Sequence, residues 1–320
     1  MKSDRPTSGQ SPSRSRPVRL VAAYPELVLV LVAAGIGLAV GRPLRWLGAH
    51  QGINVFLAVL VFATAVTVST DALGGILASW RQLAAVLAAG VVVLPALSWF
   101  ASRMVPAGSL RDGITTIGIA PCEIASVATT ALAGGEPALA AAVLIGSTAL
   151  SVSAAGAILS LEAPGAHIHP GHILVDLAVV VALPLAVGLV VRARAGTTPL
   201  REVIASRTAM GVLGVLVALV AAEVHLEAAY FAVLGAIVVV VAVSAVIGAA
   251  LGRTTSPARA VPLLLTMSMR DFAIAAGLAS AAFGPAAAAP LGLYGVVVIV
   301  WGTAVAGRFR ARRGAPQTQT

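Results

Sequence analysis

Uninterrupted runs of apolar residues recur along the whole chain, separated by short polar stretches. Leu27–Val40, Val212–Ala222 and Val233–Leu251 are runs in which almost every side chain is aliphatic. A helix needs about 20 such residues to cross the roughly 30 Å of hydrocarbon in a bilayer. The pattern therefore predicts an all-α membrane protein with about ten spans, near residues 25–42, 53–70, 82–103, 112–133, 137–160, 173–193, 208–223, 229–251, 259–283 and 286–307.

Composition and the two ends of the chain agree with this interpretation. Of 320 residues, 59% are hydrophobic and 10% are charged, which favours a bilayer as the surroundings of the folded chain. Residues 1–20 are polar and rich in Ser, Pro and Arg, so we expect a disordered basic N-terminal tail. Residues 21–307 are predicted to form a single transmembrane domain, and residues 308–320 a basic C-terminal tail.

Positive charge is unevenly distributed between the two sides of these spans. Lys and Arg lie mostly in the two tails and in the loops that follow even-numbered spans. The positive-inside rule then predicts a multi-pass protein of the inner (plasma) membrane with both termini in the cytoplasm. The net charge of +9 is explained by this topology and by contact with anionic membrane lipid, so nucleic acid is not an expected partner.

Two distant segments align with each other without a gap. They are "PCEIASVATTALAGGEPALAAA", from residue 121, and "MRDFAIAAGLASAAFGPAAAAP", from residue 269. The alignment places Glu123 on Asp271 and Pro137 on Pro285. With five spans in each half, the second half must enter the membrane from the opposite side. We therefore expect two inverted five-helix repeats, at about 25–160 and 173–307, which is the plan of many secondary transporters.

Each aligned segment carries a charged residue at the place where its helix is expected to break. Pro121 removes a backbone donor and disfavours helix at the preceding residue, so span four is predicted to be discontinuous there. Span nine carries Arg270 and Asp271 in the corresponding place. Carboxylates are costly inside a membrane and mark ion pathways. Glu123 and Asp271 are therefore predicted to approach each other and to form a cation or proton site beside a bound substrate.

These residues also carry a resemblance to a known family. "TTIGIAPCEIASVATTALAGG" and "MSMRDFAIAAGLASAAFGP" resemble the crossed-helix pair of the bile acid:sodium symporter superfamily. "VFATAVTVSTDALGGILASWRQL" is similar to the second span and following loop of that family. The resemblance covers most of the chain beyond the tail. It implies ten helices in two inverted repeats, with broken helices four and nine, that carry a small organic anion with sodium by alternating access.

The same resemblance implies a set of site residues. In span four the Pro of the family corresponds to Pro121, and its small and hydroxyl positions correspond to Ser126. In span five the hydroxyl pair of the family corresponds to Ser147 and Thr148. In span nine the sodium-binding Glu of the family corresponds to Thr266, its Gln to Arg270 and its Asn to Asp271. The chain thus departs from the family pattern, because its carboxylates stand where the family has neutral residues. The candidate ion- and substrate-binding residues are Cys122, Glu123, Ser126, Ser147, Thr148, Thr266, Arg270 and Asp271.

Alternatives remain open at this point. Cys122 and Asp271 are similar to residues of the arsenite permease branch, which implies a proton-coupled permease for arsenite or another metalloid with the thiolate as a soft ligand. Either sodium or protons are possible coupling ions, because burial opposes the ionisation of Glu123 while Arg270 favours it. No pattern indicates an enzyme. We expect no cofactor and no metal site beyond possible sodium ions, and interpret the His-rich stretch 167–172 as a solvated loop.

Overall fold

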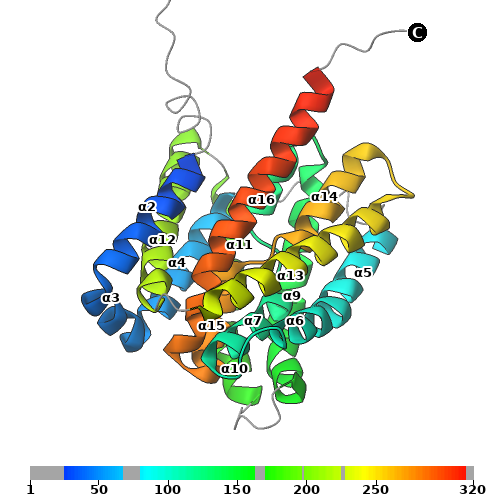
Figure 1. Ribbon diagram of the computed structural model, residues 1–320. Helices are drawn as coiled ribbons and strands as arrows, with labels where there is room; N and C mark the ends of the chain where they lie inside the picture. The colour runs from blue at the N-terminus through cyan, green and yellow to red at the C-terminus, as the bar shows by residue number, and fades with distance from the viewer. Residues whose placement is uncertain (1–24, 68–79, 163–169, 197, 225–227, 315–320) are drawn as a thin grey trace, which may run out of the picture.

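The computed structural model describes residues 25–67, 80–162, 170–196, 198–224 and 228–314, so the predicted N-terminal tail lies outside the described residues. Every regular element in these ranges is a helix, which confirms the all-α class (Figure 1). The first part of the chain contains α2 (Pro25–Ala39), α3 (Gly41–Leu47), η1 (Gly48–Gly52), α4 (Ile53–Thr67), α5 (Trp80–Ala88), η3 (Ala89–Val93), α6 (Leu94–Ser102), α7 (Ser109–Ile119), α8 (Ala125–Leu132) and α9 (Pro137–Glu162). The second contains α10 (Pro170–Leu177), η4 (Ala178–Ala182), α11 (Leu183–Ala195), α12 (Pro199–Ala222), α13 (Ala229–Gly252), α14 (Pro257–Ser268), α15 (Phe272–Phe283), η5 (Pro285–Ala288) and α16 (Ala289–Gly314).

Several of these helices have the length and composition of membrane spans. Six of the described helices qualify, namely Trp80–Ser102, Pro137–Glu162, Gly171–Arg194, Leu200–Ala222, Ala229–Gly252 and Pro285–Ala311. A bent pair, Val28–Ala39 with Gly41–Leu47, adds a seventh if it is counted as one span. Two shorter helices, α4 and α15, are also apolar. The chain is therefore a multi-pass membrane protein, while the number of ten spans stays a prediction.

The helix ends differ from the expected spans at three places. α12 begins at Pro199, before the expected start at 208, because Pro at the first helical position and Glu202 in the first turn start the helix within a charged stretch. α16 continues to Gly314, so the expected C-terminal tail is partly helical. α2 ends at Ala39 and the chain bends by 100° into α3. Pro43, which lacks a backbone N–H, stands in the first turn after this bend.

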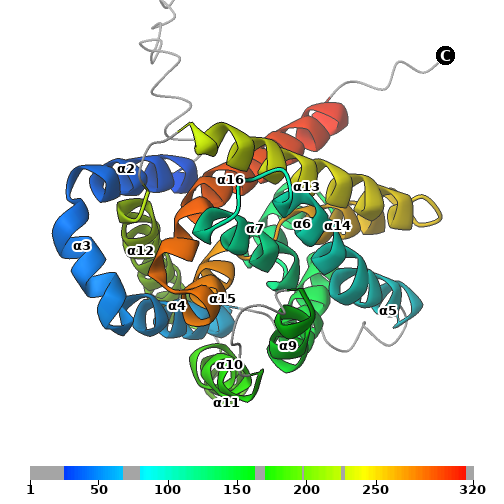
Figure 2. The ribbon, with the colours of Figure 1, turned by 60° about the horizontal axis from the view of Figure 1, so that its bottom comes forward.

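The helices separate into two groups in space. α12 packs against α2 and α4, and α11 packs against α4. We call α2, α4, α11 and α12 the four-helix group. Figures 1 and 2 show α2, α4 and α12 together on one side of the molecule and α5, α6, α13 and α14 on the other. On the second side, α13 packs against α14 and α6 packs against α7.

Two gaps between helices fall inside the aligned segments. Residues 120–124 separate α7 from α8, and residues 269–271 separate α14 from α15. We call these two stretches the paired segments. Ala120 has an extended conformation, as expected for a residue that precedes a proline. Both Met269 and Asp271 are also extended.

Backbone hydrogen bonds join the paired segments in antiparallel orientation. The N–H of Glu123 donates to the carbonyl oxygen of Met269 at 2.8 Å. The N–H of Asp271 donates to the carbonyl oxygen of Pro121 at 2.9 Å. Buried backbone groups need such partners inside a membrane, because no water is present to replace them. The pairing thus satisfies the backbone at both gaps and holds the two stretches together.

Candidate functional site

The paired segments gather four of the candidate residues into one buried place. These are Cys122, Glu123, Arg270 and Asp271, with exposed fractions of 0%, 7%, 4% and 1%. Cys122 and Arg270 lie opposite each other across the pair. The charged side chains nevertheless have different surroundings, which the sequence did not indicate.

Asp271 caps a helix. Its Oδ1 accepts hydrogen bonds from the backbone N–H groups of Ala273, at 3.0 Å, and Ile274, at 2.8 Å. These N–H groups belong to the first turn of α15, where they have no partner within the helix. The carboxylate also faces the positive end of the α15 dipole. Asp271 is therefore held by the start of α15, and it is not among the residues that line the large cleft described below.

Glu123 lies before the first turn of α8 and faces a large cleft. Its Oε2 accepts from the backbone N–H of Phe272 at 3.4 Å, which links the two paired segments through a side chain. Its carboxyl group is one of two that line the cleft, the other being that of Glu202. The Glu202 carboxylate already forms an ion pair with Arg192 at 3.0 Å. Glu123 is thus the cleft carboxylate that belongs to the paired segments.

The cleft lies between the four-helix group and the paired segments. Its volume is about 840 Å³, enough for an organic molecule rather than an ion alone. α4, α8, α9 and α12 supply most of its lining, which is largely apolar. Thr64 and Ser206 contribute hydroxyl groups. Sequence reasoning missed the contributions of α4 and α12, because their residues have no pattern that separates a cleft face from a packed or lipid-facing one.

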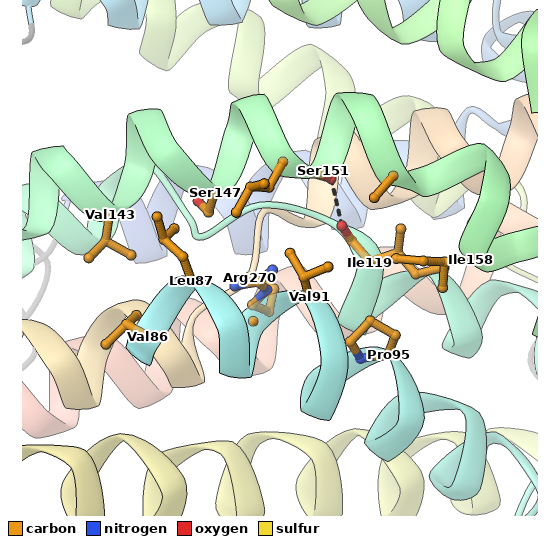
Figure 3. A pocket seen from close by; sticks show the side chains of 13 residues that line it. Val86, Leu87, Val91, Pro95, Ile119, Val143, Ser147, Ser151, Ile158 and Arg270 are labelled. Atoms are coloured by element: carbon orange, nitrogen blue, oxygen red, sulfur yellow. Dashed lines mark hydrogen bonds between the residues drawn. The ribbon is translucent and has the colours of Figure 1, made fainter. Parts of the chain in front are cut away.

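Arg270 points into a different and much smaller cavity (Figure 3). The cavity is lined by α5 and η3 on one side and by Ser147 and Ser151 of α9 on the other. A Cβ atom at Gly90 would lie 3.7 Å from Nη1 of Arg270, so the guanidinium lies directly beside η3. Its Nε is buried and has no hydrogen-bond partner in the part of the chain that the structure describes. Arg270 and Glu123 thus line separate cavities, and their joint part in one ion or substrate site stays a prediction.

Arg270 and Asp271 are neighbours in the sequence and carry opposite charges, yet they do not form an ion pair. Among the described residues the ion pairs are Arg192–Glu202 and Arg259–Glu136, at 3.0 and 3.1 Å. Asp271 is thus farther than 4.0 Å from the nitrogen atoms of Arg270. The backbone N–H of Arg270 donates instead to the hydroxyl oxygen of Tyr294 at 2.9 Å, which anchors its segment to α16.

The candidate hydroxyl groups are mostly engaged with helix carbonyls. Ser147 and Thr148 donate to the carbonyl oxygen of Leu144 at 3.1 and 2.8 Å, and Thr266 donates to that of Pro262 at 2.7 Å. This is a common arrangement for Ser and Thr in helices. The Oγ of Ser126 is buried and has no partner among the described residues.

Cys122 is enclosed by its neighbours. Its backbone N–H donates to Oγ of Ser147 at 3.2 Å, and its Sγ lies 3.5 Å from the same oxygen. The thiol is not among the groups that line the large cleft. No group of three His, Cys, Asp or Glu side chains that could hold a metal ion occurs within the described ranges. Nothing in this geometry favours the metalloid alternative.

The fold and the site together define a class of protein. A multi-pass helical membrane protein, with an organic-ligand-sized cleft that a buried glutamate helps to line, has the features of a solute transporter. A family model described as the Sodium Bile acid symporter family matches residues 54–230, and the chain belongs to this family. A search of curated proteins found no match. The chain is therefore a membrane transport protein, and the resemblance seen in its sequence is confirmed at the level of the family.

Proposed function

We propose that this chain is a secondary active transporter that moves an amphipathic organic anion together with sodium, by alternating access at the paired segments. The observation that carries the proposal is the cleft of about 840 Å³ that is lined in part by Glu123. α7 with α8, and α14 with α15, would each be one broken span. With these two broken spans the described helices are consistent with ten crossings in two inverted repeats.

The hydrogen bonds of the paired segments support the inverted repeat. The sequence alignment equates Glu123 with Asp271 and Pro121 with Met269. The bond from Glu123 to Met269 therefore becomes the bond from Asp271 to Pro121 when the two halves are exchanged. Such an exchange is expected of a twofold axis that passes between the segments. Any antiparallel bridge has such reciprocal bonds, so the specific support is its position: Cys122 and Arg270, which lie opposite each other in the bridge, are also equated by the alignment.

Packing in the four-helix group has the same symmetry. If α2 and α4 are spans one and two, then α11 and α12 occupy the equivalent places six and seven. The close packing of α2 on α12 then corresponds to the close packing of α11 on α4. This group can move as one body against the rest of the chain, which is how inverted-repeat transporters change access.

The polar groups in the cleft support coupling between a cation and an anion. Glu123 places a negative charge in the lining of the cleft, so an organic anion would be repelled unless a cation neutralises it. The first residues of α8, Ala125 among them, line the same region and present the positive end of a helix. A sodium ion at Glu123 would therefore allow the carboxylate or sulfate of a substrate to approach α8, while the apolar walls hold its body.

Charge distribution supports an orientation with cytoplasmic termini in the plasma membrane. Thr67, Pro137 and Glu202 line the cleft and lie at helix ends that adjoin the loops after even-numbered spans. Those loops and the tails hold most of the Arg residues, which the positive-inside rule assigns to the cytoplasm. The structure would then correspond to an inward-facing state.

Uptake by the purified chain in liposomes tests the proposal. Radiolabelled cholate is offered first, followed by a panel of carboxylated and sulfated anions, with an inward gradient of sodium or choline. We expect uptake that depends on sodium, and a higher sodium requirement in Glu123→Gln. Asp176→Asn, which alters an exposed carboxylate on α10 outside the cleft, serves as the control.

Two results would count against the proposal. Flux that depends on a pH gradient and ignores sodium would replace sodium with protons as the coupling ion. Absence of ion-dependent flux for every anion in the panel would exclude the proposed transport of organic anions.

A further inference from the structure

The guanidinium of Arg270 is a buried cation that has no hydrogen-bonded counter-ion among the residues that the structure describes. It is 4% exposed, its Nε has no partner in the described chain, and no described carboxylate lies within 4.0 Å of its nitrogens. A buried charge in such a position needs another source of stabilisation. The arrangement of helix ends around it supplies one.

Two helices end beside Arg270. α14 ends two residues before it, and Ile119, the last residue of α7, lines the same small cavity as its side chain. The last carbonyl groups of a helix carry its negative end and have no partner within the helix. Glu123 and Asp271 instead stand before the first turns of α8 and α15. Each charged side chain of the paired segments therefore stands at the helix end of opposite sign.

Oxygen atoms around the small cavity have the chemistry of a cation site. Ser151 donates to the carbonyl oxygen of Ile119 at 2.6 Å, and both groups border the cavity (Figure 3). Ser147 adds a further hydroxyl. In secondary transporters, the carboxyl-terminal ends of broken helices and the unwound carbonyls beside them bind the coupling cation. Here the side chain of Arg270 lines the same small cavity as these oxygen atoms.

We infer that Arg270 is an attached cation that replaces a mobile one at the ends of α7 and α14. This inference rests on the proposed function for its role in coupling. The chain then binds at most one mobile sodium ion, on the cleft side at Glu123, and sodium is excluded from the small cavity. Symport of one sodium ion with a monovalent anion would be electrically neutral.

Shortening the side chain while removing its charge tests the exclusion of sodium. Arg270→Gln leaves room and oxygen atoms in the small cavity but no cation, whereas Arg270→Lys keeps a cation. Both changes are made in a Glu123→Gln background, so that the cleft site does not contribute. Thermal unfolding of each purified full-length variant is measured in about 100 mM sodium chloride and in N-methylglucamine chloride of equal ionic strength.

The expected result is a gain of sodium binding. Sodium raises the Tm of the Arg270→Gln variant by about 5 °C if its Kd is about 1 mM. The Glu123→Gln parent and the Arg270→Lys variant show no difference between the two salts. Equal responses to the two salts in all three proteins would overturn the inference.

A second measurement decides the matter if Arg270→Gln does not fold. Binding of radioactive sodium to the wild-type chain is expected to saturate at one ion or none per chain. Two ions per chain would overturn the inference. Saturation at zero would support it and would remove sodium coupling at Glu123 from the proposed function, so the two failures are distinguishable.

Discussion

Asp271 is predicted to act mainly as the cap of α15. Replacing it with Ala removes the acceptor of two backbone N–H groups, those of Ala273 and Ile274. Loss of an N-cap costs about 0.5–2 kcal/mol, and an exposed fraction of 1% prevents water from replacing the bonds. We therefore expect a loss of about 2 kcal/mol, which corresponds to a fall in Tm of roughly 3 °C for a chain of this length.

Asp271→Asn separates capping from charge. Asn is as effective as Asp at this position of a helix, so it should retain most of the stability that Ala loses. Both variants and the wild type are compared by thermal unfolding in detergent, followed through intrinsic tryptophan fluorescence. Ser256 is the control, because it occupies the N-cap of α14 but its side chain makes no capping bond. Ser256→Ala should leave Tm within about 1 °C of the wild type.

Equal losses in Asp271→Asn and Asp271→Ala would refute this reasoning. That result would mean that the negative charge beside Arg270, rather than the hydrogen bonds to α15, is what stabilises the fold. Sodium-dependent uptake gives a second readout. A cap that does not face the cleft should leave the sodium requirement of Asp271→Asn unchanged, in contrast to Glu123→Gln.

Two further predictions concern packing and the cleft. Gly118→Ala would bring a Cβ atom against the carbonyl oxygen of Leu94 and should lower Tm by several degrees. Gly35→Ala is the control, because open space surrounds Gly35 and Tm should not fall. Equal Tm values for the two variants would contradict the close packing of α7 on α6. Met210→Trp narrows the cleft and should weaken cholate binding about tenfold or more in a direct binding assay. Val203→Trp, at an exposed position on the same helix, serves as its control. Unchanged affinity of the Met210→Trp variant for cholate would place the ligand elsewhere.

The sequence by itself determined the helical class and the place of the two gaps. Long apolar runs favour helices because a bilayer leaves no other partner for the backbone. Pro121 ends α7 for a local reason, its missing N–H. The alignment of Glu123 with Asp271 also indicated which distant segments meet. The helical class and the gap at Pro121 depend on residues that are neighbours in the sequence, and the meeting of the two segments depends on an internal repeat. All three can therefore be predicted without the tertiary structure.

Only the tertiary structure decided what each charged side chain faces. Although the three are close together in the paired segments, Glu123 lines the cleft, Arg270 lines the small cavity and Asp271 caps α15. In an extended segment, successive side chains point to opposite sides, and helices distant in sequence decide what lies on each side. The cleft lining from α4 and α12 depends on the same long-range packing. Spacing along the chain contains no information about it.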